Sequence, residues 1–315
     1  MSARADGAPL VSIIIPTFEQ EELAAEAAWS ALAQDHPALE VIVVDDASPR
    51  TRYAAVQAIA DPRLRYVRRA GNVGRTENYR LSLRDLAKGD WAMVLDGDDY
   101  LIDPSFISRA VEAAREDPAV VMVAARTETR AGDVAIVSDH PGDRTVPGLD
   151  VLRALPNSRY HLQHLAVLYR RRDAVELDFY RSPAISSDWE SLYRLAARGK
   201  VRFLDRVVGV WRIHGGNASG SRERRALIGN LDIWGPVYEE AVAYGLPLKE
   251  AERCRTAVMR HMMRQHIPRV ARSLPSLFDY LAQLRRRHPS AAAGIAHGPT
   301  LARLALALFG YYGKR

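Results

Sequence analysis

The first 130 residues alternate short β-branched runs with longer amphipathic segments, and this alternation limits the possible fold more than any other feature. The apolar runs predict strands at 10–18, 39–46, 63–69 and 91–99. The segments between and after them predict helices at 20–34, 50–60, 74–87 and 104–116. Strands that are apolar almost throughout are buried on both faces, so the pattern predicts a mostly parallel sheet between helices, an α/β architecture.

Beyond residue 119 the pattern changes. The apolar runs at 119–130, 165–171 and 201–214 are more polar and alternating, which favours mixed or antiparallel pairing, and 187–199 predicts one clear helix. The small polar residues at 214–221 predict a loop or hinge, and the periodicity is helical from there to the end. We therefore expect an α/β domain over 1–221 and a helical region over 222–315.

Composition narrows the class of protein. The single cysteine, Cys254, excludes a disulfide framework within the chain and a cysteine zinc site, and it suits a reducing compartment. The apolar run near the start is about six residues long and the one near the end about ten, against the roughly 20 needed to cross a bilayer. A cytoplasmic protein is expected. The net charge of +6 suits an anionic partner.

Polar side chains follow each of the four predicted strands. Because the carboxyl ends of parallel strands meet at one edge of a sheet, these residues are expected to line one ligand site. With the residues between them, the residues at or just after these strand ends are Pro16, Thr17, Phe18 and Glu19 for the first strand, Asp45 and Asp46 for the second, Asn72 and Gly74 for the third, and Asp96, Gly97, Asp98 and Asp99 for the fourth.

The acidic cluster after the fourth strand needs a positive partner. A turn or a helix N-cap explains Asp103, but not Asp96, Asp98 and Asp99. Hard divalent cations bind oxygen ligands and leave room for water and substrate phosphates. The cluster therefore predicts a Mg²⁺ or Mn²⁺ diphosphate site.

Other candidates have an ordinary structural alternative beside the functional one. Asp46 can accept a hydrogen bond from the imide N–H of uracil, with Phe18 as a stacking surface, or it can form a turn. Arg75 follows a glycine-containing loop and can bind phosphate, although such loops are common. Asp188 opens a predicted helix, where it is either an N-cap or a general base. His214 ends a strand, where it either ligates a metal or is structural.

Taken in order, six segments between residues 10 and 220 resemble glycosyltransferase family 2, which has the GT-A fold. They are SIIIPTFEQEE, SALAQDHPALEVIVVDDASP, NVGRTENYR, WAMVLDGDDYLIDP, SDWESLYRLAARG and VWRIHGGNAS. The resemblance implies inverting transfer from a nucleotide sugar, UDP-linked by default, to a glycan, glycolipid or metabolite, with Mn²⁺ or Mg²⁺. It implies a nucleotide site at Pro16, Thr17, Phe18, Glu19, Asp46, Asn72, Gly74, Arg75, Asp96 and Gly97, metal ligands at Asp98, Asp99 and His214, and the base at Asp188.

Two positions depart from the family pattern. Many relatives have Asn where this chain has Glu19, and Glu where it has Ser187. The nucleoside edge and the acceptor side are therefore expected to differ in shape from those relatives.

The rival functions depend on features that this sequence lacks. A nucleotidyltransferase needs a basic, glycine-rich first loop, and a dinucleotide dehydrogenase needs G-x-G-x-x-G after the first strand. A nucleotide-sugar or glycan binding protein that has lost catalysis would lack the base or a metal ligand. This chain has a candidate for each, Asp188 and Asp98. No nucleic-acid partner is expected.

The helical tail has three open interpretations. It can cap the catalytic domain, pair with a second copy, or rest on the inner face of the cell membrane. The membrane interpretation depends on the apolar segment LALALFGYY and on a basic face formed by Arg253, Arg255, Arg260, Arg264, Arg269, Arg272 and Arg285 to Arg287.

Overall fold

The computed structural model describes residues 7–157, 160–217, 220–270 and 273–293. Within these residues ten strands form one mixed sheet, with the path β3-β2-β1-β4-β9-β6-β10-β5, β7 beside β6 and β8 beside β10. The strands are β1 Val11–Thr17, β2 Leu39–Asp45, β3 Leu64–Arg68, β4 Trp91–Val94, β5 Tyr100–Leu101, β6 Val120–Ala131, β7 Val134–Val137, β8 Arg144–Pro147, β9 Val167–Arg170 and β10 Lys200–Arg212.

The predicted division into parallel and mixed parts is confirmed. β3, β2, β1 and β4 are parallel neighbours. β9 then runs antiparallel to both β4 and β6, whereas β6 and β10 are parallel. The first half of the sheet therefore brings the carboxyl ends of four strands to a common edge.

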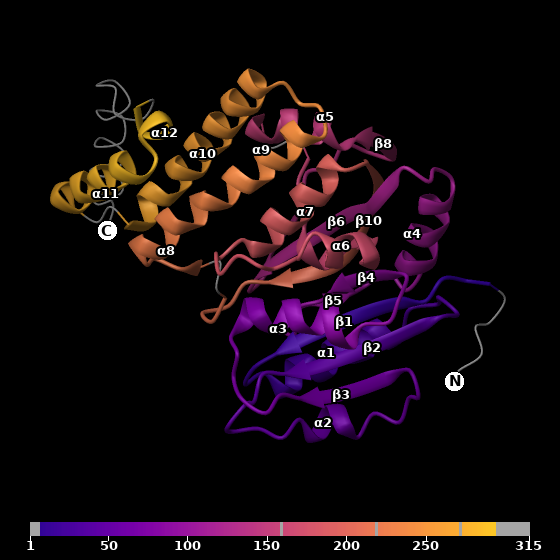
Figure 1. Ribbon diagram of the computed structural model, residues 1–315. Helices are drawn as coiled ribbons and strands as arrows, with labels where there is room; N and C mark the ends of the chain where they lie inside the picture. Colours follow the sequence, from indigo (N-terminus) through magenta and orange to yellow (C-terminus); the bar gives the residue numbers. More distant parts are fainter. Residues whose placement is uncertain (1–6, 158–159, 218–219, 271–272, 294–315) are drawn as a thin grey trace.

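Helices cover both faces of this sheet (Figure 1). One face is covered by α1 Glu21–Leu32, α2 Ala54–Gln57 and α4 Phe106–Arg115. The other is covered by α3 Arg75–Leu81 with its π-helical continuation Ser82–Leu86, α5 Gly148–Ala154, α6 Arg171–Glu176 and α7 Ser187–Ala197. The C-terminal helices are α8 Arg224–Gly229, α9 Trp234–Ala243, α10 Leu248–Val270, α11 Leu274–Arg287 and α12 Pro289–Ala293.

Strand β1 shows why the first strands are apolar throughout. All of its residues are buried. Ile13 and Ile15 belong to the hydrophobic cluster under α1 and α4, whereas Ile14 belongs to the cluster on the opposite face. Successive side chains of a strand point to opposite faces, so a strand between two helical layers needs an apolar residue at every position.

Two predicted elements are shorter than expected. The strand predicted at 91–99 ends at Val94, and Asp99 N–H instead donates to the Asp96 carbonyl in a tight turn, 2.9 Å away. The helix predicted at 50–60 covers only Ala54–Gln57, because it begins after Tyr53 in a left-handed conformation with φ of 53°. In both places a turn conformation replaces part of the predicted strand or helix.

The C-terminal helices share a hydrophobic core with the α/β part. Trp234 on α9 is fully buried, with its ring centroid 5.8 Å from Tyr193 and 6.3 Å from Trp189 of α7. The Tyr238 hydroxyl donates to the Leu152 carbonyl at 3.0 Å. One cluster joins these helices to the sheet, so residues 222–293 cap the fold.

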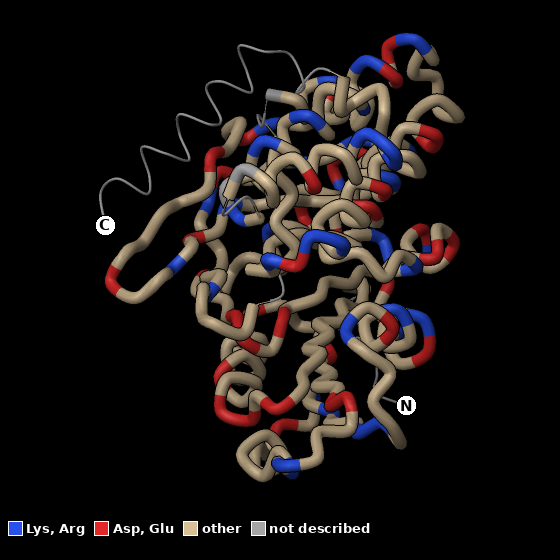
Figure 2. Tube along the Cα trace, turned by 90° about the vertical axis from the view of Figure 1, so that its left-hand side faces the viewer, with Lys and Arg blue, Asp and Glu red and all other residues tan. Residues whose placement is uncertain are grey.

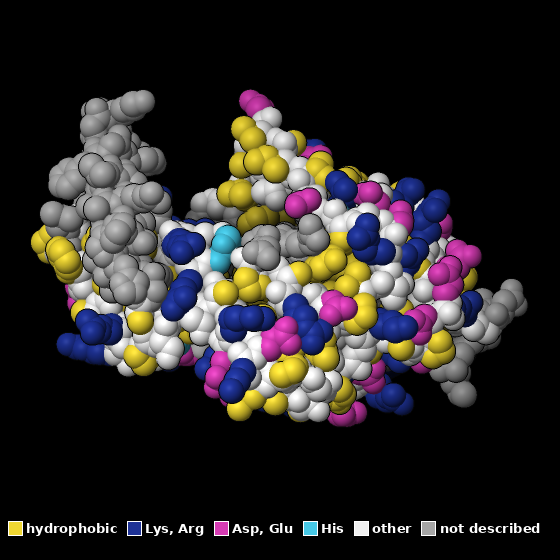
Figure 3. All heavy atoms as spheres, turned by 90° about the horizontal axis from the view of Figure 1, so that it is seen from above, with side chains coloured by type: hydrophobic (Ala, Val, Ile, Leu, Met, Phe, Trp, Pro, Cys, Tyr) yellow, Lys and Arg dark blue, Asp and Glu magenta, His cyan; other side chains and the backbone are white. Residues whose placement is uncertain are grey.

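Charges are spread over the molecule. Basic and acidic positions are interspersed along the trace (Figure 2), and basic side chains on the face in Figure 3 are separated by other surface. Arg260 donates to the carbonyls of Ser290 and Ala291, and Arg287 pairs with Asp232. Among the described helices none is long and apolar enough to span a membrane. The segment LALALFGYY lies outside the described residues.

A glycine marks the tightest contact between α5 and α7. A Cβ added to Gly148 would lie 1.6 Å from the Ala196 carbonyl oxygen. The backbone would have to move to relieve this clash. We expect Gly148→Ala to lower the free energy of unfolding by about 3 kcal/mol or more, the upper range for overpacking. Gly235→Ala on α9 is the matched control, since its nearest neighbour is the tip of Glu239 at 3.9 Å. In denaturant unfolding, the stability of Gly235→Ala should equal that of the wild type or be slightly higher. If both variants were equally stable, the tight contact at Gly148 would be contradicted.

Candidate active site

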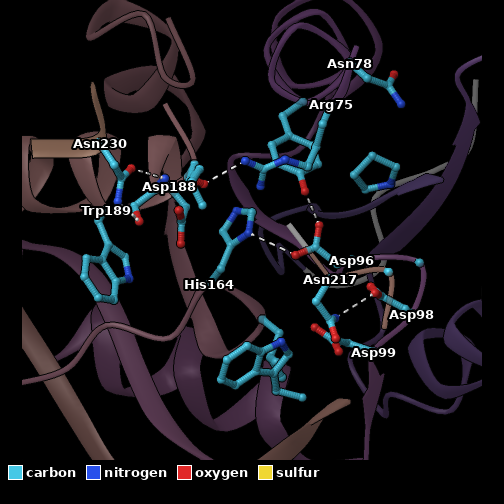
Figure 4. A pocket seen from close by; sticks show the side chains of 18 of the residues that line it. Arg75, Asn78, Asp96, Asp98, Asp99, His164, Asp188, Trp189, Asn217 and Asn230 are labelled. Carbon is cyan, nitrogen blue, oxygen red and sulfur yellow. Dashed lines mark hydrogen bonds and ion pairs between the residues drawn. The ribbon is translucent and has the colours of Figure 1, made fainter. Parts of the chain in front are cut away.

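A cavity of about 750 Å³ opens at the carboxyl ends of β1, β2 and β4, with α7 and the C-terminal helices on its opposite side. Figure 4 shows its polar side chains in close view. Of the residues named from the sequence, it is lined by Pro16, Thr17, Phe18, Asp46, Asn72, Gly74, Arg75, Asp96, Gly97, Asp98, Asp99 and Asp188. The chain therefore brings together groups that the sequence spreads over more than 170 positions.

Glu19 and His214 are placed differently from the rest. Glu19 is not among the described residues that line the cavity; its carboxylate accepts from the backbone and the guanidinium of Arg50. That hydrogen bonding lowers the pKa of Glu19. His214 is also outside the lining, but its Nε2 lies 2.8 Å from Asp98 Oδ2. His214 therefore reaches the site through Asp98.

The ends of β1 and β4 approach each other closely. Gly97 N–H donates to the Pro16 carbonyl at 3.2 Å, and a Cβ on Gly97 would lie 3.0 Å from both Cβ and Oγ1 of Thr17. Thr17 Oγ1 is also 2.9 Å from the Tyr53 hydroxyl. Phe18 is 44% exposed beside this contact, so a flat ring system can stack on its face.

Asp46 holds the loop that follows β3. Its two carboxylate oxygens accept from the backbone N–H groups of Val73 and Gly74, each at 2.9 Å, and the residue is only 3% exposed. Asn72 Oδ1 accepts from the same Gly74 N–H at 3.1 Å. A nucleobase contact at Asp46 can use only the remaining lone pairs, so the carboxylate also has a structural role that the sequence pattern did not reveal.

Arg75 connects the strand-end side of the cavity to the segment before α7. Its guanidinium donates to the Ile185 carbonyl at 2.7 Å and lies over the Tyr79 ring, 5.6 Å from the centroid. Burial opposes the charge, but nearby Tyr79, Asp96 and Asp188 outweigh it and raise the pKa of Arg75. The residue therefore keeps its charge in the cavity.

Asp98 and Asp99 have different environments. Asp98 Oδ2 lies near His214 and 3.3 Å from Asn217 Nδ2, whereas Asp99 is 2% exposed and accepts from the Arg212 backbone N–H at 3.0 Å. Burial, with the charge of Asp96 next, raises the pKa of both carboxyl groups, and that of Asp99 strongly. A nearby cation would relieve this destabilisation.

The donor set fits a divalent cation with substrate ligands. Within the described part of the chain no group of three or more His, Cys, Asp or Glu side chains could hold a metal alone. Asp98 and His214 nevertheless offer one oxygen and one imidazole nitrogen side by side, which suits Mn²⁺, while Mg²⁺ prefers oxygen alone. Diphosphate and water would have to supply the remaining ligands.

Asp96 faces the middle of the cavity and is held from two sides. The Tyr79 hydroxyl donates to its Oδ1, and its Oδ2 lies 3.5 Å from His164 Nδ1. Burial alone would raise the pKa of Asp96, but the hydrogen bond and charge of His164 outweigh burial and lower it. The sequence analysis missed His164, since a single histidine before an apolar run carries no distinctive pattern.

Asp188 lies in the first turn of α7, where the preceding segment is fixed by the C-terminal region. Ser186 N–H donates to Asn230 Oδ1 at 2.7 Å, and Asn230 Nδ2 donates to Ser186 Oγ at 3.0 Å. Burial is the main cause that raises the pKa of Asp188, while His164 and Arg75 act in the opposite direction. The C-terminal helices also contribute Leu227, Met262, Gln265 and His266 to the cavity. No motif in the sequence pointed to these residues.

Asn230 provides a test of this support. Because Asn230 is 4% exposed, Asn230→Ala leaves Ser186 N–H without its partner and should destabilise the fold by about 1–3 kcal/mol. If Asp188 is the base and UDP the nucleotide that the family resemblance implies, loss of alignment at Asp188 should lower turnover about ten-fold or more and leave UDP affinity unchanged. Asn230→Asp keeps the acceptor and should recover part of the loss. Calorimetric UDP titration and steady-state kinetics measure both effects; wild-type turnover in Asn230→Ala would refute the supporting role.

Comparison with known proteins places this arrangement in a family. The model of glycosyl transferase family 2 matches residues 12–176, more than half of the chain, and the chain belongs to this family of glycosyltransferases. Succinoglycan biosynthesis protein ExoO of Rhizobium meliloti is 36% identical over 109 residues, which cover 35% of this chain and 31% of ExoO.

Solved structures agree on the fold. S. aureus TarS 1–349 in complex with UDP-GlcNAc has a TM-score of 0.73 at 17% identity, covering 91% of this chain and 83% of that one. Mannosyltransferase PcManGT from Pyrobaculum calidifontis, in complex with GDP-Man and Mn²⁺, has a TM-score of 0.57 at 20% identity, covering 98% and 89%. The expected GT-A fold is confirmed, with helices added at its C-terminal end.

Proposed function

We propose that this chain transfers a sugar from a nucleoside diphosphate sugar, UDP-linked by default, to an acceptor hydroxyl with inversion at the anomeric carbon. The observation that carries the proposal is that Asp188 and the strand-end carboxylates line one cavity. In-line displacement needs a base on the acceptor side and a charged cradle for the leaving group on the other.

The acceptor side requires a general base. A sugar hydroxyl is a weak nucleophile, so a carboxylate must take its proton as the oxygen attacks the anomeric carbon. Asp188 is the candidate. Its raised pKa makes it a better proton acceptor than an exposed aspartate, and Asn230 and Arg75 hold the segment before it.

The donor side requires positive charge and a nucleoside surface. A divalent cation held by Asp98 and His214 would neutralise charge that develops on the departing diphosphate. Arg75 adds a permanent positive charge near the same place. Phe18 and Thr17 at the end of β1 form the nucleoside surface, with Asp46 and Asp96 directed at base and ribose. Mn²⁺ fits the oxygen and nitrogen pair better than Mg²⁺.

The relatives give the proposal its direction. TarS is described with UDP and with UDP-GlcNAc, and PcManGT with GDP-Man and Mn²⁺. ExoO takes part in succinoglycan biosynthesis. An extracellular polysaccharide or its lipid-linked precursor is therefore the acceptor class that we favour.

A donor screen tests the proposal without knowledge of the acceptor. Ligands that bind the native state raise the unfolding temperature, so UDP-, GDP- and dTDP-sugars are compared with and without Mn²⁺. The stabilising donor is then incubated alone, and NMR follows the anomer that first appears on hydrolysis by water. We expect metal-dependent stabilisation by one UDP-sugar and release of the inverted anomer.

Other results would point elsewhere. Stabilisation without hydrolysis or transfer would favour a nucleotide-sugar binding protein that has lost catalysis. A retained anomer would exclude inversion, and stabilisation that is the same without metal would exclude the proposed cation.

A further inference from the structure

His164 lies between the two sides of the cavity. It starts the short 3₁₀ turn His164–Ala166 that leads into β9, and Figure 4 shows its ring between Asp96 and Asp188. Nδ1 is 3.5 Å from Asp96 Oδ2, and the side chain is only 10% exposed. No motif in the sequence assigned it a role.

Both ring nitrogens of His164 have a partner that can accept a hydrogen bond. Nδ1 faces Asp96, and Nε2 is 2.9 Å from the Tyr180 hydroxyl. That hydroxyl is in turn 3.1 Å from the Tyr169 hydroxyl, which can accept its proton. In this buried position an imidazolium can therefore donate to the Tyr180 hydroxyl from Nε2 and pair with Asp96 through Nδ1.

Arg75 also brings positive charge to Asp96 and Asp188, but its hydrogen bonds go to backbone carbonyls rather than to either carboxylate. His214 is paired with Asp98. Asp96 and Asp188, however, face each other across the middle of the cavity. Two ionised carboxylates in a partly enclosed space repel each other, and each makes the other harder to ionise. A positive charge between them removes this obstacle.

We propose that His164 is a positioning residue that holds a positive charge between Asp96 and Asp188, keeping Asp188 ionised as the base and Asp96 fixed toward the donor. The first part rests on the proposed function of Asp188 as base. The charge coupling itself stands independently of that function, and it can be measured without any substrate.

The electrostatics of the neighbouring groups agree with this arrangement. Burial opposes the charge on His164, but Asp96 and Asp188 outweigh it and raise the imidazole pKa. Reciprocally, His164 lowers the pKa of Asp188 against the effect of burial. Other charged and titratable groups face His164 and Asp188. They are Arg75 and Tyr79 from α3, Asp96 from the end of β4, His161, Tyr180 and, on α7, Tyr193.

The first test measures the coupling directly. The imidazole resonances of histidine-labelled protein are titrated in the wild type and in Asp188→Asn, and the His164 signal is assigned by its loss in His164→Asn or, if that variant does not fold, in His164→Gln. Linkage is reciprocal, so removing the charge of Asp188 must move the His164 titration to lower pH. His140, which accepts from the Gly142 N–H and is absent from the cavity lining, is the control, because Asp188 is not among the groups that shift its pKa. An unchanged His164 titration would overturn the proposal.

The second test separates positioning from a merely structural role. His164→Asn retains a donor toward Asp96 but loses the charge, so the acidic limb of donor hydrolysis should move to higher pH. Below that limb we expect a loss of about ten-fold, the equivalent of one pKa unit, with activity recovered above it. UDP affinity in Mn²⁺ should change less than three-fold, roughly 0.6 kcal/mol. A loss of the same size at every pH would indicate a structural role and contradict the inference.

These tests fail in different ways. If the His164 titration responds to Asp188→Asn but no donor is hydrolysed, the coupling holds and the proposed function fails. If a donor is hydrolysed with an acidic limb that His164→Asn leaves in place, the proposed function holds and the role of His164 fails.

Discussion

Asp188→Asn is expected to lower sugar transfer by about 10³-fold, within the 10²–10⁴-fold range of a general base. The amide keeps the size of the side chain but cannot accept the acceptor proton. UDP affinity should be unchanged, because Asp188 lies on α7 whereas the proposed nucleoside surface is at the ends of β1, β2 and β4. Steady-state kinetics together with calorimetric UDP titration separate the two effects.

The pH dependence of stability tells this loss apart from misfolding. The folded-state pKa of Asp188 is raised, chiefly by burial, so the folded protein binds this proton more tightly than the unfolded chain. Folding is therefore favoured more as the pH falls through that pKa, and an ionised Asp188 destabilises the fold at neutral pH. Asp188→Asn should consequently be as stable as the wild type or more so at pH 7. The exposed Asp133→Asn in the turn between β6 and β7 is the control and should leave both turnover and stability unaltered. Near-normal turnover in Asp188→Asn would remove this residue from the role of base.

Asp98→Asn is expected to weaken UDP binding in the presence of Mn²⁺ by roughly 100-fold and to reduce transfer by about 10³-fold. The amide cannot supply the negative charge that a divalent cation needs, so metal and diphosphate are lost together. Without Mn²⁺ the variant and the wild type should bind UDP equally weakly. His214→Asn should cause a smaller loss, because Asp98 still supplies a charged oxygen ligand.

A comparison with the neighbouring carboxylate makes this second experiment more specific. Asp99→Asn tests whether the Asp99 carboxylate binds the metal or only holds the backbone. The second role is suggested by its hydrogen bond from the Arg212 backbone N–H. Burial raises the pKa of Asp99 strongly, and an Asn oxygen can still accept from the Arg212 N–H. We therefore expect Asp99→Asn to be at least as stable as the wild type at pH 7, with little effect on the metal dependence of UDP binding. If Asp98→Asn retains Mn²⁺-dependent UDP binding, the metal site lies elsewhere or does not exist.

Local pattern was enough to predict the carboxylate site because strand ends are defined by sequence. An apolar run, a turn and a carboxylate are neighbours in the chain, and parallel pairing then brings Thr17, Asp46 and Asp96 to one edge. The same reasoning did not reveal what Asp46 bonds to, because its partners belong to a loop 27 and 28 residues away.

The contacts that hold the segment before Asp188, the proposed base, could not be predicted from local sequence pattern. Asn230 and Ser186 are 44 residues apart, and His214 and Asp98 are 116 apart. Neither pair follows a periodicity. The first contact depends on how the C-terminal helices pack against α7, and the second on the antiparallel pairing of β5 with β10. The helical region 222–293 had no recognisable motif, yet its side chains line the cavity and share the core under α7.

The sequence by itself determined the order of strands and helices, the covered sheet and the carboxylates at its edge, because burial and turn chemistry act on residues close in the chain. Only the tertiary structure decided that His164 lies between Asp96 and Asp188, that Asn230 holds the segment before Asp188, and that C-terminal helices line the pocket. Those contacts depend on how segments far apart in the sequence pack against one another. Hydrophobic patterning permits that packing but does not specify it.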